Sequence, residues 1–183
     1  MQKRNWQRPS TVGDSDFRKL APGGYVVKIV AANDYESREY FELVYDIAEG
    51  PDTGFYSDAW GVTHPYAHRI IMSYKDSALN MLEGRLNAID ASNPGFDSRA
   101  VCDANRFDMF VGRLVGVNLQ EEEYKKNDGN VGVRLNVCQV VNAQDVRDGK
   151  VKAKEIKRLS SDQNPVRLVG AAEVVDDIVI PFA

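Results

Sequence analysis

Residues 113–142 read RLVGVNLQEEEYKKNDGNVGVRLNVCQVVN, two runs rich in β-branched residues joined by a short polar segment. The joining residues Lys126-Asn127-Asp128-Gly129-Asn130 favour a tight turn, because Asn, Asp and Gly tolerate the backbone angles that such turns need. We therefore expect a β-hairpin, with one strand over Arg113–Glu122 and the other over Val131–Asn142.

Three shorter strands are expected upstream of this hairpin. Residues 25–31 form a β-rich run that follows Gly23-Gly24, and Asn33-Asp34 supplies a turn after it. Residues 40–47 alternate in polarity, with Phe41, Leu43, Tyr45 and Ile47 on one face. Residues 50–54 would end that strand, and Phe55–Trp60 is the expected third strand.

Between the third strand and the hairpin, the spacing of apolar residues changes to that of a helix. Leu79, Leu82, Leu86 and Ile89 recur at intervals of three and four residues, which predicts an amphipathic helix. Asp76 or Ser77 is expected to cap its start, and Asn93-Pro94-Gly95 to end it. Downstream, Phe107, Met109 and Phe110 are expected to pack beneath the core.

This order predicts a mainly β protein: a five-stranded OB-fold barrel with a helix between strands 3 and 4. The competing fold is a small antiparallel sheet of another topology with one packing helix. We expect a polar and basic arm over 1–22, the OB-fold domain over 23–145, and a polar linker with an acidic, then apolar tail over 146–183.

Composition agrees with a folded soluble chain. Of the 183 residues 43% are hydrophobic, and the net charge is −4, which does not exclude a local basic surface. We find no apolar run of membrane-spanning length, and Met1–Trp6 is not followed by an apolar signal region, so a cytoplasmic location is expected, in bacteria or in a phage-infected host. Cys102 and Cys138 lack metal-site spacing and are expected to be reduced core residues.

Aromatic and basic residues are interleaved at several places outside the apolar periodicity. Proteins that coat single-stranded nucleic acid use flat rings for base stacking and cations for the phosphates. Any one surface Lys is usually only solvated, but the set as a whole predicts a single-stranded DNA site. Its candidate residues are Lys3, Arg4, Trp6, Arg8, Lys28, Arg38, Tyr40, Trp60, Tyr66, Arg69, Tyr74, Lys75, Arg113 and Arg134. Trp6 and Trp60 are the strongest single candidates, and Lys125 and Lys126 add charge to the hairpin.

The end of the chain carries a second feature. Asp176 and Asp177 precede Ile178-Val179-Ile180-Pro181-Phe182-Ala183. This segment resembles the C-terminal tip of bacterial and phage single-stranded DNA-binding proteins, in which an acidic stretch and Ile-Pro-Phe dock on replication and repair enzymes. The resemblance implies that Asp176, Asp177, Ile180, Pro181 and Phe182 bind partner proteins. Val179 and Ala183 depart from the pattern, and the alternative is an edge strand or a buried terminal segment.

Three internal segments resemble single-stranded DNA-binding-like proteins of prophages and mobile elements in Gram-positive bacteria. They are Ile70–Leu79, Tyr45–Gly50 and Leu119–Tyr124, and the likeness would extend over most of residues 20–150. It implies the same OB-fold and the same binding of single strands.

Catalytic motifs are weak in this sequence. His64 and His68 are four residues apart, but Pro65 disfavours the helix that would align them as metal ligands. The acidic run Glu121-Glu122-Glu123 is typical of a solvated strand end, and neither a phosphate-binding loop nor a nucleophile elbow is found. We therefore expect no catalytic residue, no metal and no cofactor.

The sequence thus predicts a non-catalytic single-stranded DNA-binding protein for replication, recombination or repair. Its expected partners are single-stranded DNA and, through the tail, replication or recombination enzymes, without a membrane. The alternative is a phage adaptor or inhibitor module on an OB-like scaffold, and an enzyme would need carboxylates clustered in a cleft. The sequence does not decide whether copies of the chain form a homo-oligomer.

Overall fold

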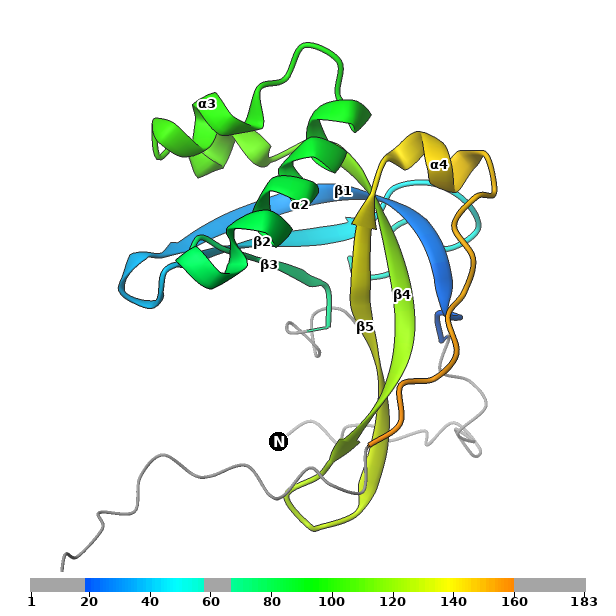
Figure 1. Cartoon of the computed structure of the whole chain (residues 1–183). Helices are drawn as coiled ribbons and strands as arrows, with labels where there is room; N and C mark the ends of the chain where they lie inside the picture. Colours follow the sequence, from blue (N-terminus) through cyan, green and yellow to red (C-terminus); the bar gives the residue numbers. More distant parts are fainter. Residues whose placement is uncertain (1–18, 58–66, 160–183) are drawn as a thin grey trace, which may run out of the picture.

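The computed structural model describes residues 19–57 and 67–159. Within these ranges five strands form one antiparallel sheet in the order β3-β2-β1-β4-β5. The helices gather on one side of the sheet, and the β4–β5 hairpin projects away from this body as an arm (Figure 1). Strands β3 and β5 are the two edges of the sheet, and no ladder between described residues joins them. No helix in the described ranges is long and apolar enough to cross a bilayer.

The central strand is β1 (Gly23–Tyr35), which pairs with β4 through its first half and with β2 through its second. An irregularity between Ile29 and Ala31 shifts the register where β1 passes from one partner to the other. The turn expected at Asn33-Asp34 is wrong, because both residues are paired with β2. The chain reverses instead at η2 (Glu36–Arg38), where Glu39 adopts a left-handed conformation with φ of 57°.

The alternation predicted for 40–47 is confirmed in β2 (Tyr40–Ile47). Phe41, Leu43, Tyr45 and Ile47 are at most 2% exposed and face the core. The side chains between them lie on the opposite face of the sheet.

The third strand is β3 (Arg69–Ser73), so the strand predicted at Phe55–Trp60 is wrong in its described part, which forms turns. The reason is Asp46, whose carboxylate accepts hydrogen bonds from the backbone N–H of Tyr56 (2.9 Å) and from the Ser57 hydroxyl. An N–H held by a side chain is not available to a strand ladder. In β3, Ile70 and Met72 point into the core and pair with β2.

Three short elements and one longer helix cover the sheet. Helix α2 (Leu79–Ser92) follows η3 (Asp76–Ala78), and it precedes α3 (Ser98–Asp103) and η4 (Phe107–Phe110). The predicted apolar stripe is confirmed at Leu86 and Ile89, both buried, and Leu82 packs against the core. It is wrong at Leu79, which begins the helix and is 43% exposed. The expected cap is wrong, because Ala78 occupies the N-cap position and no side chain caps the helix.

Aromatic stacking joins η4 to the sheet. Phe110 is fully buried, and Phe107 stacks on Phe41 with ring centroids 4.5 Å apart. Met109 was expected in the core but is 43% exposed, because Phe107 and Phe110 take the side of this short turn that faces the sheet.

The predicted hairpin is confirmed as β4 (Leu114–Lys125) and β5 (Val131–Val141). Gly129 takes φ of 86° in the connecting turn, and Asp128 accepts a bond from the Asn130 N–H (3.0 Å). Tyr124 crosses to Gly132 on the partner strand, where a Cβ atom would lie 2.9 Å from the tyrosine ring.

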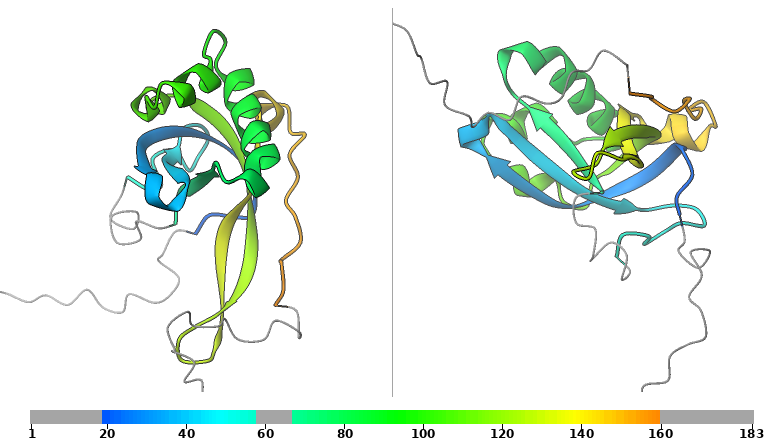
Figure 2. Two further views of the ribbon diagram at one scale, coloured as in Figure 1. Left: turned by 60° about the vertical axis from the view of Figure 1, so that its left-hand side comes forward. Right: turned by 90° about the horizontal axis from the view of Figure 1, so that it is seen from below.

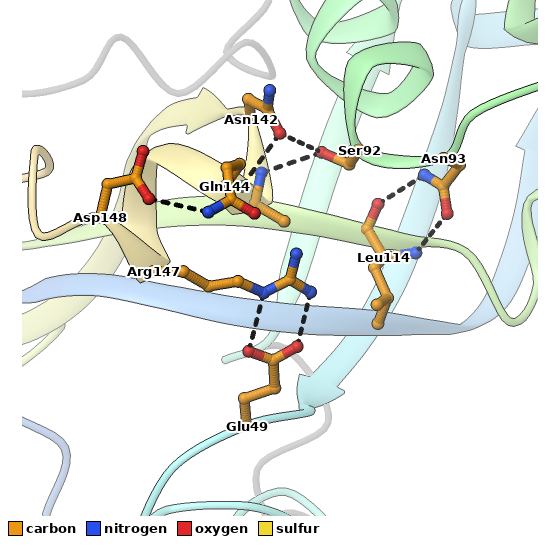
Figure 3. Close-up of polar contacts among 9 residues, drawn as sticks. Glu49, Ser92, Asn93, Leu114, Asn142, Gln144, Arg147 and Asp148 are labelled. Carbon is orange, nitrogen blue, oxygen red and sulfur yellow. Dashed lines mark hydrogen bonds and ion pairs between the residues drawn. The ribbon is translucent and has the colours of Figure 1, made fainter.

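Polar contacts fasten the helices to the sheet (Figure 3). Asn93, just beyond α2, both donates to the Leu114 carbonyl (2.7 Å) and accepts from the Leu114 N–H (3.0 Å). Ser92 accepts from the N–H of Ala143 in α4 (Ala143–Arg147), and Arg147 binds Glu49 through two bonds of 2.6 and 3.1 Å. These contacts join α2, α4 and the end of β2 to β4.

Residues 150–159 run alongside β4, away from α4 and along the arm (Figures 1 and 2); we call them the strap. Where β1 no longer pairs with β4, Lys157 takes its place, donating to Glu121 O (2.8 Å) and accepting from Glu123 N (2.9 Å). Asn118 and Gln120 bind the strap carbonyls of Lys152 and Glu155. Packing thus continues past residue 145, where the sequence placed the end of the domain.

Candidate nucleic-acid interface

One face of the β1–β2–β3 region points away from the core, and we call it the outer face. Cross-strand pairing sets Tyr35 beside Tyr40, Asn33 beside Glu42 and Lys28 beside Asp46. On the other side of β2, Val44 pairs with Arg69 and Glu42 with Ile71. The predicted residues Lys28, Tyr40 and Arg69 therefore share this face.

A pair of tyrosine rings stands at one end of the outer face. Tyr35 and Tyr40 flank the η2 turn and stack with centroids 4.9 Å apart and planes inclined by 26°. Both side chains are partly exposed and lie outside the apolar core cluster. Such a pair offers a flat surface on which a base can stack.

A buried carboxylate anchors the middle of the face. Glu42 is 2% exposed and accepts bonds from Arg69 Nη1 (2.7 Å), Asn33 Nδ2 (3.1 Å) and the Tyr35 hydroxyl (3.3 Å). The Glu42 charge raises the pKa of Tyr35, so this phenol stays protonated and continues to donate. The network fixes the orientation of the first tyrosine and of the Arg69 guanidinium.

Three exposed cations lie on the outer face or at its ends. Arg38 lies in η2, between the two tyrosines in sequence, and Lys75 follows β3, whose Ser73 pairs with Tyr40. Lys28 lies at the opposite end of the face, where it pairs with Asp46. None of these three forms an ion pair with another described residue. Asp46 lies opposite Lys28 in the β1–β2 ladder, but its carboxylate already accepts hydrogen bonds from Ile47 N, Tyr56 N and the Ser57 hydroxyl. Their charges are therefore available to phosphate.

The structure does not bring the remaining described candidates to this face. Tyr74 packs against the core from the other side and donates to Asp34 (3.4 Å). Arg113 lies 4.3 Å above the Phe96 ring, near η4. Arg134 is on the arm, bound to Glu122 (3.1 Å) and 5.3 Å above the Tyr124 ring.

The arm forms a second group of cations and one ring. Lys125 and Lys126 are exposed at the tip, and Tyr124 is partly exposed beside Arg134. Sequence reasoning missed Tyr124 and Tyr35 as candidates. Each precedes the turn of a hairpin, and an aromatic residue in a polar stretch at such a place could have indicated an exposed ring.

The charged groups at the centre of the arm hold its strands and the strap together. Glu122 accepts from Lys157 Nζ (2.6 Å), Arg134 (3.1 Å) and Asn136 (3.1 Å). These bonds, with that from Lys157 first, lower the pKa of Glu122 to about 2. The carboxylate thus ties the strap to both strands of the arm.

Residues outside the described ranges include several predicted ones. They are Lys3, Arg4, Trp6, Arg8, Trp60, Tyr66 and the tail residues Asp176, Asp177, Ile180, Pro181 and Phe182. Within residues 19–57 and 67–159, no three His, Cys, Asp or Glu side chains are grouped so that they could hold a metal ion.

Comparison with known proteins leaves the chain without an assigned family. No family model matches the sequence, and no curated protein matches it significantly.

Proposed function

We propose that this protein is a non-catalytic single-stranded DNA-binding protein of the OB-fold class, acting in replication, recombination or repair. The observation that carries the proposal is the Tyr35–Tyr40 stack on the outer face, with Arg69 held near it by Glu42 and the exposed Lys28 further along the same face. Stacked rings and cations on one sheet face are the elements that hold bases and phosphates without reading sequence.

The strand order supports the OB-fold interpretation. An OB barrel has five strands with a helix between the third and fourth, and the order β3-β2-β1-β4-β5 with α2 between β3 and β4 is compatible with such a barrel left open between β3 and β5. OB-folds bind oligonucleotides on the face of strands 2 and 3 and with the loops that join strands 1–2 and 4–5. Here that surface corresponds to the outer face, η2 and the arm tip.

Partner recruitment by the tail belongs to the same proposal. Asp176, Asp177 and the Ile180-Pro181-Phe182 tip would offer carboxylates to a basic rim and an aromatic anchor to a pocket. Deleting residues 176–183 is expected to leave DNA affinity unchanged or tighter while removing partner binding. A loss of folding on deletion would assign the segment to the core.

The decisive experiment is titration with oligo-dT, followed by tryptophan fluorescence and by anisotropy of a labelled strand. Tyr40→Leu should weaken binding by about tenfold or more, since a stacked base contributes about 1–3 kcal/mol. Tyr74→Leu is the matched control, because it makes the same change on the other face. Equal affinities for the wild type and Tyr40→Leu, with folding confirmed by circular dichroism, would reject the proposed face.

The second candidate function is a protein-interaction module on the same scaffold. It is favoured by a groove on the opposite side of the sheet, rimmed by Asp34, Glu36 and Asp103, which DNA would avoid. Replacing Trp6 and Trp60 with Ala separates the two candidates. The change should abolish DNA binding under the first and leave partner binding intact under the second.

A further inference from the structure

The groove lies where the β1–β2 turn meets the helices. It has a volume of about 520 Å³ and is open to solvent. Its apolar lining comes from Phe41, Tyr74, Leu82, Cys102 and Phe107. Phe107 is partly exposed and stacks on the buried Phe41, so the core fixes the orientation of the ring that the groove presents.

The rim of the groove is acidic. Asp34, Glu36 and Asp103 line it, no Lys or Arg does, and none of the three forms an ion pair with a described residue. The pKa of Tyr74 is raised, first by the loss of solvation and then by the charges of Asp34, Glu36 and Glu39. Burial, with Asp103 and Asp90, raises the pKa of Cys102 to about 11. An occupant of this groove must therefore be cationic at its edges and apolar at its centre.

The chain itself contains a segment of that chemistry. Residues 3–8 read Lys-Arg-Asn-Trp-Gln-Arg, one large aromatic ring flanked by three cations. The other end of the chain does not fit, because Glu173, Asp176 and Asp177 would be repelled by the rim. Trp rings in apolar grooves with charged flanks are the contacts that dominate many protein interfaces.

The reach of the segment favours an intermolecular contact. The described chain begins at Lys19, just before the start of β1, whereas Asp34 lies at the far end of this strand. The eleven steps from Gly23 to Asp34 span about 36 Å at strand spacing. The thirteen residues from Trp6 to Lys19 reach about 45 Å only when fully extended. A return along its own molecule would thus require the segment to be about four-fifths extended, whereas the segment of a neighbour is under no such restriction.

We propose that the groove binds residues 3–8 of a second copy of this chain, with Trp6 against the partly exposed Phe107, Tyr74 and Leu82. Lys3, Arg4 and Arg8 then face Asp34, Glu36 and Asp103. Because each copy offers one groove and one segment, two copies can exchange segments in a closed dimer, or the contact can continue head-to-tail into a larger assembly. The inference does not depend on DNA binding.

Sedimentation velocity of the full-length protein without DNA, over a range of concentrations, tests the association. The wild type should form concentration-dependent oligomers, and Trp6→Ala should raise the dissociation constant at least tenfold. Raising the salt concentration should weaken the oligomers, since the rim contacts are ionic.

A charge exchange tests the pairing itself. One variant carries Asp34→Lys, Glu36→Lys and Asp103→Lys, and the other carries Lys3→Glu, Arg4→Glu and Arg8→Glu. Each alone should remain monomeric, because like charges meet, whereas an equimolar mixture should associate through the restored pairs. Asp128→Lys with Glu155→Lys is the control for added positive charge and should still associate as the wild type does.

Three outcomes would overturn the proposal. The first is a wild type that stays monomeric at all concentrations, and the second is a mixture that does not associate. The third is a contact between Trp6 and the groove that does not depend on protein concentration, because such a contact would form within one molecule. If the triple groove variant fails to fold, Asp34→Asn with Glu36→Gln replaces it, and unchanged association of that variant overturns the proposal.

Discussion

The body and the arm of this protein are stabilised by different forces. In the body, Phe41, Tyr45, Ile89 and Phe110 are at most 1% exposed and pack in one apolar cluster. In the outer half of the arm, beyond Leu119, the strands are held by their backbone ladder and by ions centred on Glu122, and Val131 and Val133 stay exposed. The body therefore provides the stability of the fold, while the arm keeps polar groups accessible and responds to pH and salt.

The largest expected effect is in the body. Phe110→Ala removes a ring that touches Phe41 and Phe96 in a fully buried site, and it should lower the free energy of unfolding by about 3–5 kcal/mol. Urea denaturation followed by circular dichroism measures the change. Val133→Ala on the arm is the control and should change stability by about 0.5 kcal/mol or less. Equal costs would show that the arm belongs to the same cooperative core.

The next effect concerns the arm tip and depends on the proposed DNA binding. Lys125→Ala with Lys126→Ala should weaken affinity for oligo-dT by several-fold and reduce the slope of log K against log salt by about 1.4, since each phosphate contact contributes about 0.7 for single strands. Lys150→Ala is the control, because Lys150 is already paired with Asp145 and Asp148. An unchanged salt slope would remove the tip from the binding surface.

A smaller effect is expected where the strap meets the arm. Glu122→Gln should cost about 1 kcal/mol, because charge-assisted bonds on an accessible surface contribute that much. It should also speed hydrogen exchange at the Glu123 and Lys157 amides, which bond across the strap. Glu155→Gln, an exposed strap residue, should leave these rates unchanged.

The same carboxylate gives a pH dependence with a defined sign. The folded pKa of Glu122, about 2, lies below the ordinary 4.5. Its stabilisation is therefore complete above the ordinary value and is lost as pH falls from there toward 2. The difference in stability between wild type and Glu122→Gln should shrink over that range, and a constant difference would contradict an ionic tie.

The smallest effect is at Gly132. An added methyl group would meet the Tyr124 ring at 2.9 Å and the flexible end of Lys126 at 2.7 Å, so Gly132→Ala should turn the tyrosine off the strand. We expect a cost of about 1 kcal/mol or less, since exposed side chains move readily. The NMR ring shifts of Tyr124 should change while those of Phe110 do not.

Local sequence patterns predicted the elements whose conformation is determined by residues close together in the chain. The Asn127-Asp128-Gly129 turn, the alternation in 40–47 and the helical stripe ending at Asn93 all agree with the structure. Of the candidate residues, Lys28, Tyr40 and Arg69 lie on one face of the sheet, whereas Tyr74 and Arg113 do not, because the face of a residue depends on where each strand begins. The contribution of Trp6, Trp60 and Tyr66 stays a prediction.

The sequence by itself determined the order of strands, the helix before the hairpin, and the chemistry of the residues available for binding. Only the tertiary structure decided that Asp46 holds Tyr56 in a turn, that β3 forms at Arg69–Ser73, and that the strap completes the free edge of β4. The physical reason is the distance along the chain over which each interaction acts. Turn residues and apolar periodicity act on their neighbours, whereas a carboxylate that captures an N–H ten residues away, or a backbone edge left open by the end of β1, exists only once the sheet has formed.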